Sequence, residues 1–485
     1  MTAYDPQTDK FKEECGVYAV YNIENAAALT ALGLHALQHR GQEACGIATF
    51  DGEDFHVRRA LGLVDNTFSK ASVIEELPGS RAIGHNRYST SGTPVLRNVQ
   101  PLFADLSFGG LALAHNGNLT NAYGLRQALV KSGALFQSTS DTEVIVHLIA
   151  RSKEEKFEAR VVDALKQVEG AYSLVLMTRK KIMGVRDPHG VRPLILGKLN
   201  DGYILASESC ALDIVGAEYV RDIQPGELIT IDEKGMRSSF PFAKKPSRFC
   251  IFEYIYFARP DSFMEDKSIY EMRKEIGAEL ARENPVDGAD LIVPVPDSGV
   301  PAAIGYAQES GVPFELGIIR NHYVGRTFIE PTDKIRNLGV KLKHNSNRKL
   351  LAGKNVVLVD DSIVRGTTSK KIVEMVRDAG AREVHMRISS PPSKHSCFYG
   401  IDTPEDSELL AHNHSPEEIA DIIKADSVSY ISLDGLYRAV GQARRNSDDP
   451  QYCDACFSGE YPIFLTDREE KHDKMKISRL KEASK

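Results

Sequence analysis

The stretch VVLVDDSIVRGTTS, residues 356–369, has the pattern of a buried strand that ends in two acidic residues and leads through a loop into a helix. DLIVPVPDSGVPAAIGYA, residues 290–307, has the same order of apolar run, glycine-containing loop and helical pattern. Strands that alternate with helices are typical of a parallel sheet covered by helices. This part of the chain is therefore predicted to be an α/β domain with a parallel sheet.

The loop that follows the first of these strands is a candidate phosphate site. Ligands of open parallel sheets bind at the carboxyl ends of the strands, and the N–H groups at the start of a helix attract anions. Asp360 and Asp361 can accept hydrogen bonds from vicinal ribose hydroxyls or hold a metal, although an ordinary strand capped by aspartate has a similar pattern. The residues expected around the phosphate are Arg365, Gly366, Thr367, Thr368 and Ser369.

This segment resembles the phosphoribosyl-pyrophosphate (PRPP) motif of type I phosphoribosyltransferases. The resemblance implies that Ser298, from the loop of the second stretch, lies with both aspartates around Mg2+ and PRPP. In GIIRNHYVGRTFIEP, residues 317–331, Arg320 and Arg326 flank a glycine and are predicted to form a mobile lid over an anionic substrate. Arg326 is accordingly a candidate PRPP-binding residue.

A cysteine stands at the head of the first apolar run of the chain, in FKEECGVYAV, residues 11–20. An α-amine has a reference pKa near 7.7 to 8.0 and a thiol one near 8.5, so an amine on the same residue is well matched to activate the sulfur. The N-terminal residue can then serve as nucleophile and base together. This interpretation requires removal of the polar leader, residues 1–14; otherwise Cys15 is an ordinary packed residue.

Four further segments accompany this cysteine, and together with it they resemble the class II glutamine amidotransferase domain of the N-terminal-nucleophile hydrolases. The resemblance implies an α+β domain with αββα layers, followed by the α/β type I phosphoribosyltransferase domain. Hydrolysis of glutamine needs donors for an oxyanion, a cation for the substrate carboxylate and an anion for its ammonium group. The segments are LQHRGQEACGIAT (37–49), GHNRYSTSG (84–92), LAHNGNLTN (113–121) and STSDTEVIVHL (138–148).

The resemblance also implies a role for single residues of these segments. Cys15 is the implied nucleophile, and Asn116 with the N–H of Gly117 is the implied oxyanion hole. Glutamine is implied to bind through Arg87 at its carboxylate and Asp141 at its ammonium group, with Arg40 and Gly41 near the nucleophile.

Four of the seven cysteines stand in a pattern that suits a metal centre. Cys453 and Cys456 form a C-x-x-C in YCDACFSG, while Cys250 and Cys397 are far away in the sequence. The residues themselves leave zinc, an iron–sulfur cluster and a redox pair open. Cys45 and Cys210 are predicted to be ordinary packed residues.

The two resemblances together indicate a family of two-domain enzymes that open purine synthesis. The implied reaction converts glutamine, PRPP and water to 5-phosphoribosylamine, glutamate and pyrophosphate. One branch of the family has a propeptide and a [4Fe–4S] cluster on cysteines in the contexts of Cys250, Cys397, Cys453 and Cys456, and the family also suggests a homotetramer inhibited by purine nucleotides. The predicted division is a propeptide at 1–14, an amidotransferase domain at 15–245, a phosphoribosyltransferase domain at 246–465 and a charged tail at 466–485.

Bulk properties exclude several other classes of protein. The 485 residues carry a net charge of −7 without a concentrated basic stretch, which argues against nucleic-acid binding. No apolar run approaches the roughly 18 residues that span a bilayer, and the leader is no secretory signal, so the cytoplasm is the expected compartment. Two alternatives are a class II amidotransferase with another acceptor, such as an amino-sugar synthase, and a non-enzymatic PRPP sensor.

Overall fold

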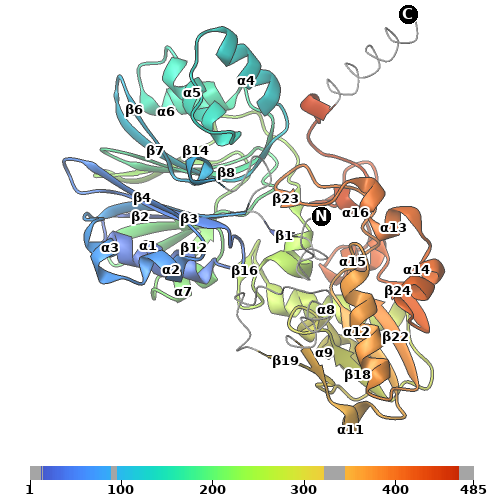
Figure 1. Cartoon of the computed structure of the whole chain (residues 1–485). Helices are drawn as coiled ribbons and strands as arrows, with labels where there is room; N and C mark the ends of the chain where they lie inside the picture. The colour runs from blue at the N-terminus through green and yellow to red at the C-terminus, as the bar shows by residue number, and fades with distance from the viewer. Residues whose placement is uncertain (1–11, 14, 89–94, 322–343, 469–485) are drawn as a thin grey trace, which may run out of the picture.

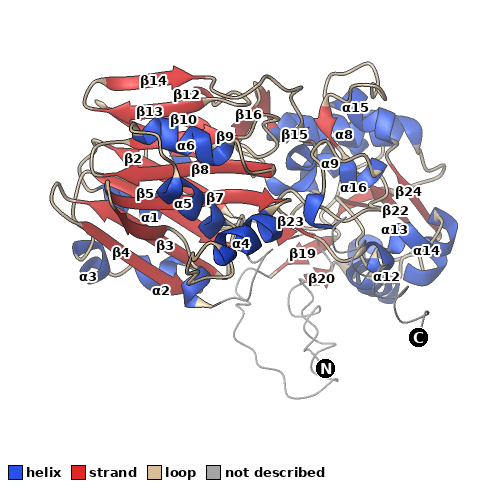
Figure 2. Ribbon diagram, turned by 90° about the horizontal axis from the view of Figure 1, so that it is seen from above, coloured by secondary structure: helices blue, strands red, loops and turns tan. Residues whose placement is uncertain are grey.

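The computed structural model describes residues 12–13, 15–88, 95–321 and 344–468, which form two domains side by side (Figure 1, Figure 2). The first domain contains two stacked antiparallel sheets, and the second contains a parallel sheet. None of the helices in the described part of the chain is long and apolar enough to cross a membrane.

The first sheet of the first domain has seven strands, and four helices cover its outer face (Figure 1). Its strands are, in spatial order, β12 (Glu218–Asp222), β10 (Ile195–Leu199), β11 (Gly202–Ala206), β2 (Gly16–Tyr21), β5 (Arg81–Arg87), β3 (Ala44–Phe50) and β4 (Phe55–Leu61). The helices are α1 (Ala26–Ala36), α2 (Val64–Phe68), α3 (Ala71–Glu75) and α7 (Cys210–Asp213).

The second sheet has six strands, and three helices cover its outer face (Figure 1). Its strands are β14 (Gly235–Ser239), β13 (Leu228–Asp232), β9 (Ile182–Arg186), β8 (Gly170–Thr178), β7 (Gly109–Leu119) and β6 (Leu102–Leu106). The helices are α4 (Ala122–Lys131), α5 (Thr142–Arg151) and α6 (Phe157–Leu165).

Strand β2 shows why the first domain has four layers. Tyr18 and Val20 pack under the helices of the first sheet, whereas Val17 and Ala19 pack against the second sheet. A strand that is buried on both faces needs apolar residues at every position, which explains the continuous run after Cys15. The predicted αββα arrangement is confirmed.

The second domain has a four-stranded parallel sheet with helices on both faces. Along β21, Val357 and Val359 face one apolar cluster and Val356 and Leu358 face the other. The predicted parallel α/β architecture is therefore confirmed. The strands are, in order, β18 (Leu291–Pro294), β21 (Asn355–Asp360), β22 (Glu383–Ile388) and β24 (Ser427–Tyr430); the helices are α8 (Ile269–Glu283), α9 (Val300–Ser310), α12 (Thr367–Asp378), α14 (Pro416–Ile423) and α15 (Leu433–Ala439).

Short elements complete the described chain. A π-helical turn η3 (Glu253–Phe257) lies near the start of the second domain, and β19 (Ile318–Arg320) pairs with β20 (His344–Ser346). The others are β1 (Lys12–Glu13), η2 (Leu96–Asn98), β15 (Phe249–Cys250), β16 (Phe263–Met264), β17 (Lys267–Ser268), α11 (Arg348–Leu351), β23 (Ile401–Asp402), η4 (Asp406–Glu408), α13 (Leu410–Asn413), β25 (Tyr452–Cys453) and α16 (Ala455–Ser458).

Both ends of the described chain join the two domains. The leader strand β1 pairs antiparallel with β23 of the second domain. Near the other end, the carboxylate of Asp467 accepts the N–H groups of Tyr123 and Gly124, at 2.7 and 3.0 Å. These N–H groups begin helix α4, whose own N-cap residue, Asn121, makes no side-chain capping bond. A residue from the end of the chain therefore caps a helix of the first domain.

Candidate active sites

A small pocket in the first domain brings together four of the residues predicted from the sequence. Cys15 precedes β2, Arg87 ends the neighbouring strand β5, Gly117 lies in β7 of the other sheet, and Asp141 is the N-cap of α5. Tyr88, Gln100, His115, Ser140 and Thr142 also line this pocket. Segments separated by more than a hundred residues thus place a thiol, a cation and an anion around one space.

Cys15 is held in an unusual backbone conformation at the edge of the pocket. Its φ angle is +67°, in the left-handed region that residues other than glycine seldom adopt. The side chain is mostly buried, and Sγ lies 3.7 Å from the carbonyl oxygen of Tyr88. The next residue, Gly16, starts β2 and pairs with Asn86 of β5, so the sheet fixes the position of the thiol.

Backbone N–H groups orient the carboxylate of Asp141. Oδ1 accepts the N–H of Thr142 at 2.8 Å and so caps α5, while Oδ2 accepts the N–H of Leu119 at 3.0 Å. The Asp141 carboxylate thus accepts one N–H group at the start of α5 and one from the end of strand β7. It can therefore present a fixed negative charge to the pocket.

His115, Gln100 and Thr142, which line the pocket, form a buried hydrogen-bond network that was not predicted from the sequence. The His115 N–H donates to Oε1 of Gln100 at 2.8 Å, and Nε2 of Gln100 donates to Oγ1 of Thr142 at 3.1 Å. Burial lowers the pKa of His115 and favours its neutral form. His115 stands beside Asn116 in a recognised segment and could have been found there, whereas no sequence pattern pointed to Gln100.

The two residues predicted for the oxyanion hole lie next to each other on β7 but have different surroundings. Gly117 lines the pocket with a φ of +140°, and a Cβ atom there would lie 2.1 Å from the carbonyl oxygen of Ala171. Only glycine fits this position. Asn116 is fully buried, with Nδ2 3.5 Å from Oγ of Ser207, and does not line the pocket.

Arg40 lies outside the pocket lining and bridges the two domains instead. Its buried guanidinium contacts Glu208 of the first domain and lies 2.7 Å from Oε1 of Glu253 of the second. Arg192 approaches the same oxygen at 2.9 Å. Gly41 lies against the backbone of β5, where a Cβ atom would come within 2.7 Å of the Arg87 nitrogen. The roles of Arg40 and Gly41 in glutamine binding stay predictions.

Removing the charge of Glu253 should destabilise the domain interface. We expect Glu253→Gln to lower the free energy of unfolding by about 3 kcal/mol, because two buried guanidinium groups would face a neutral amide. Urea unfolding followed by fluorescence measures the change. Glu271→Gln, at an exposed position of α8, is the control and should unfold like the unchanged protein. Equal midpoints for both variants would contradict the bridging role.

The second candidate site lies at the carboxyl ends of two neighbouring strands, β18 and β21. The loop with Ser298 follows β18, and Asp360 and Asp361 stand at the end of β21, both buried. A Cβ atom on Gly299 would lie 2.3 Å from the carbonyl oxygen of Val359, so glycine is required where the loop crosses the strand. The structure thus places Ser298 and both aspartates at one edge of the sheet.

The segment between β21 and α12 has the predicted strand–loop–helix form. Gly366 has a φ of +77° at the N-cap of α12, and the helix starts at Thr367 with Thr368 and Ser369 in its first turn. The side chain of Arg365 turns away to Glu408, with Nε 3.1 Å from Oε2. Arg320 pairs with Asp297, next to Ser298, and Arg326 lies outside the described residues.

The four cysteines predicted to hold a metal centre converge in the second domain. Cys250 and Cys453 are direct partners on the parallel strands β15 and β25, and Cys456 follows in α16. Cys397 packs against the same apolar cluster as the other three. Burial, with smaller contributions from Glu253 and Cys397, raises the pKa of Cys250 to about 12. Burial and the neighbouring thiols also raise the pKa values of Cys453 and Cys456. Cys45 and Cys210, in contrast, are buried separately in the first domain.

Comparisons with known proteins assign both domains. Residues 85–213 match a family model described as a glutamine amidotransferase domain, and residues 268–394 match one described as a phosphoribosyl transferase domain. A solved structure of the glutamine PRPP amidotransferase of Bacillus subtilis, complexed with ADP and GMP, has a TM-score of 0.88 to this chain at 46% identity. That match covers 93% of this chain and 98% of the other.

Similarity extends over nearly the whole chain. An amidophosphoribosyltransferase of Rhizobium etli is 55% identical over 478 residues, which cover 97% of this chain and 96% of that protein. The one of Bacillus subtilis is 48% identical, with 93% of this chain and 94% of that protein covered. With both active-site domains in the same order and this degree of identity throughout, the chain belongs to the amidophosphoribosyltransferase family.

Proposed function

We propose that the two sites divide the family's reaction between them. The chain is a transferase that makes 5-phosphoribosylamine, glutamate and pyrophosphate from PRPP, glutamine and water, the first committed step of purine synthesis. In this proposal the first domain releases ammonia from glutamine and the second transfers it to PRPP. The arrangement of Cys15, Arg87, Gly117 and Asp141 around one pocket is the observation that supports it most. Neither another acceptor nor a regulatory role fits a chain with this family membership.

Cys15 acts, in this proposal, once residues 1–14 have been removed. Its α-amine then takes the thiol proton, and the thiolate attacks the side-chain amide of glutamine to form a thioester and release ammonia. The N–H of Gly117, with Asn116 beside it, stabilises the oxyanion. Arg87 binds the substrate carboxylate and Asp141 its ammonium group. Water then hydrolyses the thioester to glutamate.

Asp141 offers a test of substrate binding. Asp141→Asn keeps one oxygen that can accept the N–H of Thr142 and cap α5, but the group that faces the N–H of Leu119 becomes an amide nitrogen and the charge is lost. We expect the KM for glutamine to rise about tenfold or more, because a charged hydrogen bond to the ammonium group is lost. Activity with ammonia should be unchanged. Asp105→Asn, on exposed β6, is the control, and an unchanged KM for Asp141→Asn would overturn the assignment.

The second site supplies the chemistry at PRPP. Asp360 and Asp361 would accept the ribose hydroxyls, and the N–H groups and hydroxyls from Arg365 to Ser369 would bind the 5-phosphate at the start of α12. Carboxylate and hydroxyl oxygens are ligands that Mg2+ prefers, so Ser298 and the aspartates fit a magnesium ion bound with the pyrophosphate. Mg2+ would neutralise charge on the leaving pyrophosphate. Arg326 is proposed to contact PRPP as well.

The cysteine group is proposed to hold a [4Fe–4S] cluster through Cys250, Cys397, Cys453 and Cys456. Cys250 and Cys453 are partners on β15 and β25, and Cys397 and Cys456 pack against the same apolar cluster, which supports one centre with four thiolate ligands. Such a cluster would act as a structural cross-link of β15, β25 and the segment with Cys397.

Loss of one cluster ligand should remove the iron. We expect anaerobically purified protein to contain about four iron atoms per chain and Cys397→Ser to contain markedly less. Iron analysis and the visible absorption of the cluster measure this. Cys45→Ala changes a thiol buried elsewhere and should leave the iron content as it is. Zinc in place of iron in the unchanged protein would show that the cluster assignment is wrong.

The regulation, oligomeric state and cellular location of the protein are proposed from its membership of the family. The Bacillus subtilis relative was solved with ADP and GMP, which supports purine nucleotides as feedback inhibitors of this chain too. A homotetramer in the cytoplasm is proposed from the same relationship.

Glutamate release from glutamine, measured with and without PRPP and Mg2+, tests the proposal as a whole. Release that rises with PRPP, with matching pyrophosphate, is expected. Glutamate release at the same rate with and without PRPP would contradict the coupling of the two sites.

A further inference from the structure

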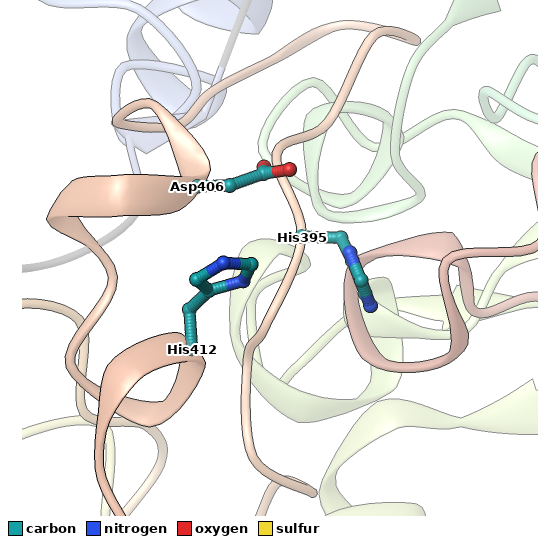
Figure 3. A group of neighbouring side chains, drawn as sticks. All are labelled: His395, Asp406 and His412. Carbon is teal, nitrogen blue, oxygen red and sulfur yellow. The ribbon is translucent and has the colours of Figure 1, made fainter.

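Two histidines and an aspartate meet at the surface of the second domain, outside both active sites. His395 lies in the segment between β22 and β23, Asp406 begins η4, and His412 lies in α13. One nitrogen of each ring and one carboxylate oxygen all lie within 4.8 Å of one another. Asp406 and His412 extend from two short helical turns toward the extended segment that carries His395 (Figure 3).

Hydrogen bonds to these side chains orient them as ligands. Nδ1 of His412 lies 2.8 Å from the carbonyl oxygen of Lys394, so the N–H stands at Nδ1 and Nε2 keeps the lone pair. Oδ1 of Asp406 accepts the N–H and hydroxyl of Ser396 at 2.7 and 2.6 Å, which fixes the carboxylate. Histidines whose second nitrogen binds a carbonyl, and carboxylates held by a neighbouring donor, are typical of metal sites.

We propose that His395, Asp406 and His412 bind a divalent transition-metal ion, for which Zn2+ is the best match. Two imidazoles and one carboxylate suit zinc, with water as the fourth ligand. Ligands about 2.1 Å from a tetrahedral ion lie about 3.4 Å apart, so the side chains would move inward by about an ångström. His412 is exposed and gives the ion a route from solvent. Arg468, 3.8 Å from Oδ2 of Asp406, would turn away.

A bound ion would restrain the segment that carries Cys397. The N–H groups of Lys394 and His395 donate to the carbonyl oxygen of Cys456 at 3.0 and 3.1 Å. The Cys397 N–H donates to Oγ1 of Thr403 at 2.7 Å. A metal ion that joins His395 to the two helical turns would therefore close residues 395–412 into a loop. This loop contains Cys397, so the ion would also restrain the position of that cysteine relative to Cys456.

Zinc binding to the full chain tests this site. The anaerobically purified protein is dialysed against micromolar Zn2+, and zinc and iron per chain are measured together. Zinc-edge X-ray absorption separates the two kinds of site, because nitrogen and oxygen ligands lie at 2.0–2.2 Å and thiolates near 2.3 Å. We expect one zinc per chain with nitrogen and oxygen ligands only and no loss of iron.

Variants at the exposed end of the site complete the test. His412→Asn should weaken zinc binding at least tenfold, and His395→Asn should do the same. His414→Asn, at a nearby histidine beside Glu418, is the control and should bind zinc like the unchanged protein. Thiolate ligands in the absorption data, or equal zinc binding by all three variants and the unchanged protein, would overturn the proposal. Because His412 is exposed, its replacement does not endanger the fold.

Discussion

Cys15→Ala is expected to abolish the use of glutamine and to leave synthesis of 5-phosphoribosylamine from ammonia intact. The nucleophile takes part in every glutamine turnover, and loss of such a group lowers kcat by about a thousandfold or more. The second site has no need of the thiol when ammonia is supplied from solution. Glutamate release and PRPP-dependent product formation, each measured with both nitrogen sources, would show this separation.

Cys45→Ala is the matched control for this experiment. Cys45 lies in β3, beside β5, and its thiol is as buried as that of Cys15. Burial raises the pKa of Cys45 to about 12, so its thiol is protonated at neutral pH and unreactive. The control should keep both activities. Glutamine use by Cys15→Ala at the unchanged rate would show that another group is the nucleophile.

Asp360→Asn combined with Asp361→Asn is expected to lower product formation with both glutamine and ammonia, by about a hundredfold or more. Both nitrogen sources end at the same PRPP site, and the substitution removes two charges from the edge of the sheet where Mg2+ and the ribose are proposed to bind. Asparagine is nearly isosteric, and its oxygen at 360 can still accept the N–H of residue 361, as Oδ1 of Asp360 does at 2.9 Å.

Two measurements distinguish a lost site from a lost fold in that variant. Glutamate release without PRPP should persist, because the pocket around Cys15 lies in the other domain. Asp421→Asn, on the exposed side of α14, should leave all activities unchanged. If ammonia-dependent synthesis stayed normal in the double variant, the two aspartates would not form the PRPP site.

Local pattern predicted strands well: the apolar run after Cys15 is β2, and the run that leads to Asp360 and Asp361 is β21. It is less informative about where a helix ends. AAALTALGLHALQHR, residues 26–40, has the apolar spacing of one continuous helix, whereas α1 ends at Ala36. The chain leaves the helix there and carries Arg40 to its buried contacts with Glu208 and Glu253. Those partners lie more than 160 residues away, so local periodicity could not reveal them.

The candidate sites show the same limit of sequence reasoning. Charged or reactive groups in recognised segments, such as Cys15, Arg87 and Asp141, were predicted and lie together in the structure. Gln100 was missed because its neutral amide acts only through a hydrogen bond to Thr142, 42 residues further along the chain. No local sequence pattern marks such a contact. The bridging position of Arg40 was missed because a single arginine has no pattern that distinguishes an ion pair between domains from substrate binding.

The capping of α4 by Asp467 bears on the order in which the protein is completed during its synthesis. A ribosome delivers the amidotransferase domain first, and domains fold as they emerge. The start of α4 stays exposed to water until almost the last described residue has left the ribosome, and the buried ion pair of Arg40 with Glu253 cannot form until residue 253 follows. A nascent chain that stops before residue 253 would therefore hold a first domain in which α4 lacks its cap and Arg40 lacks the Glu253 carboxylate, and such a domain opens to proteases more readily than that of the finished chain.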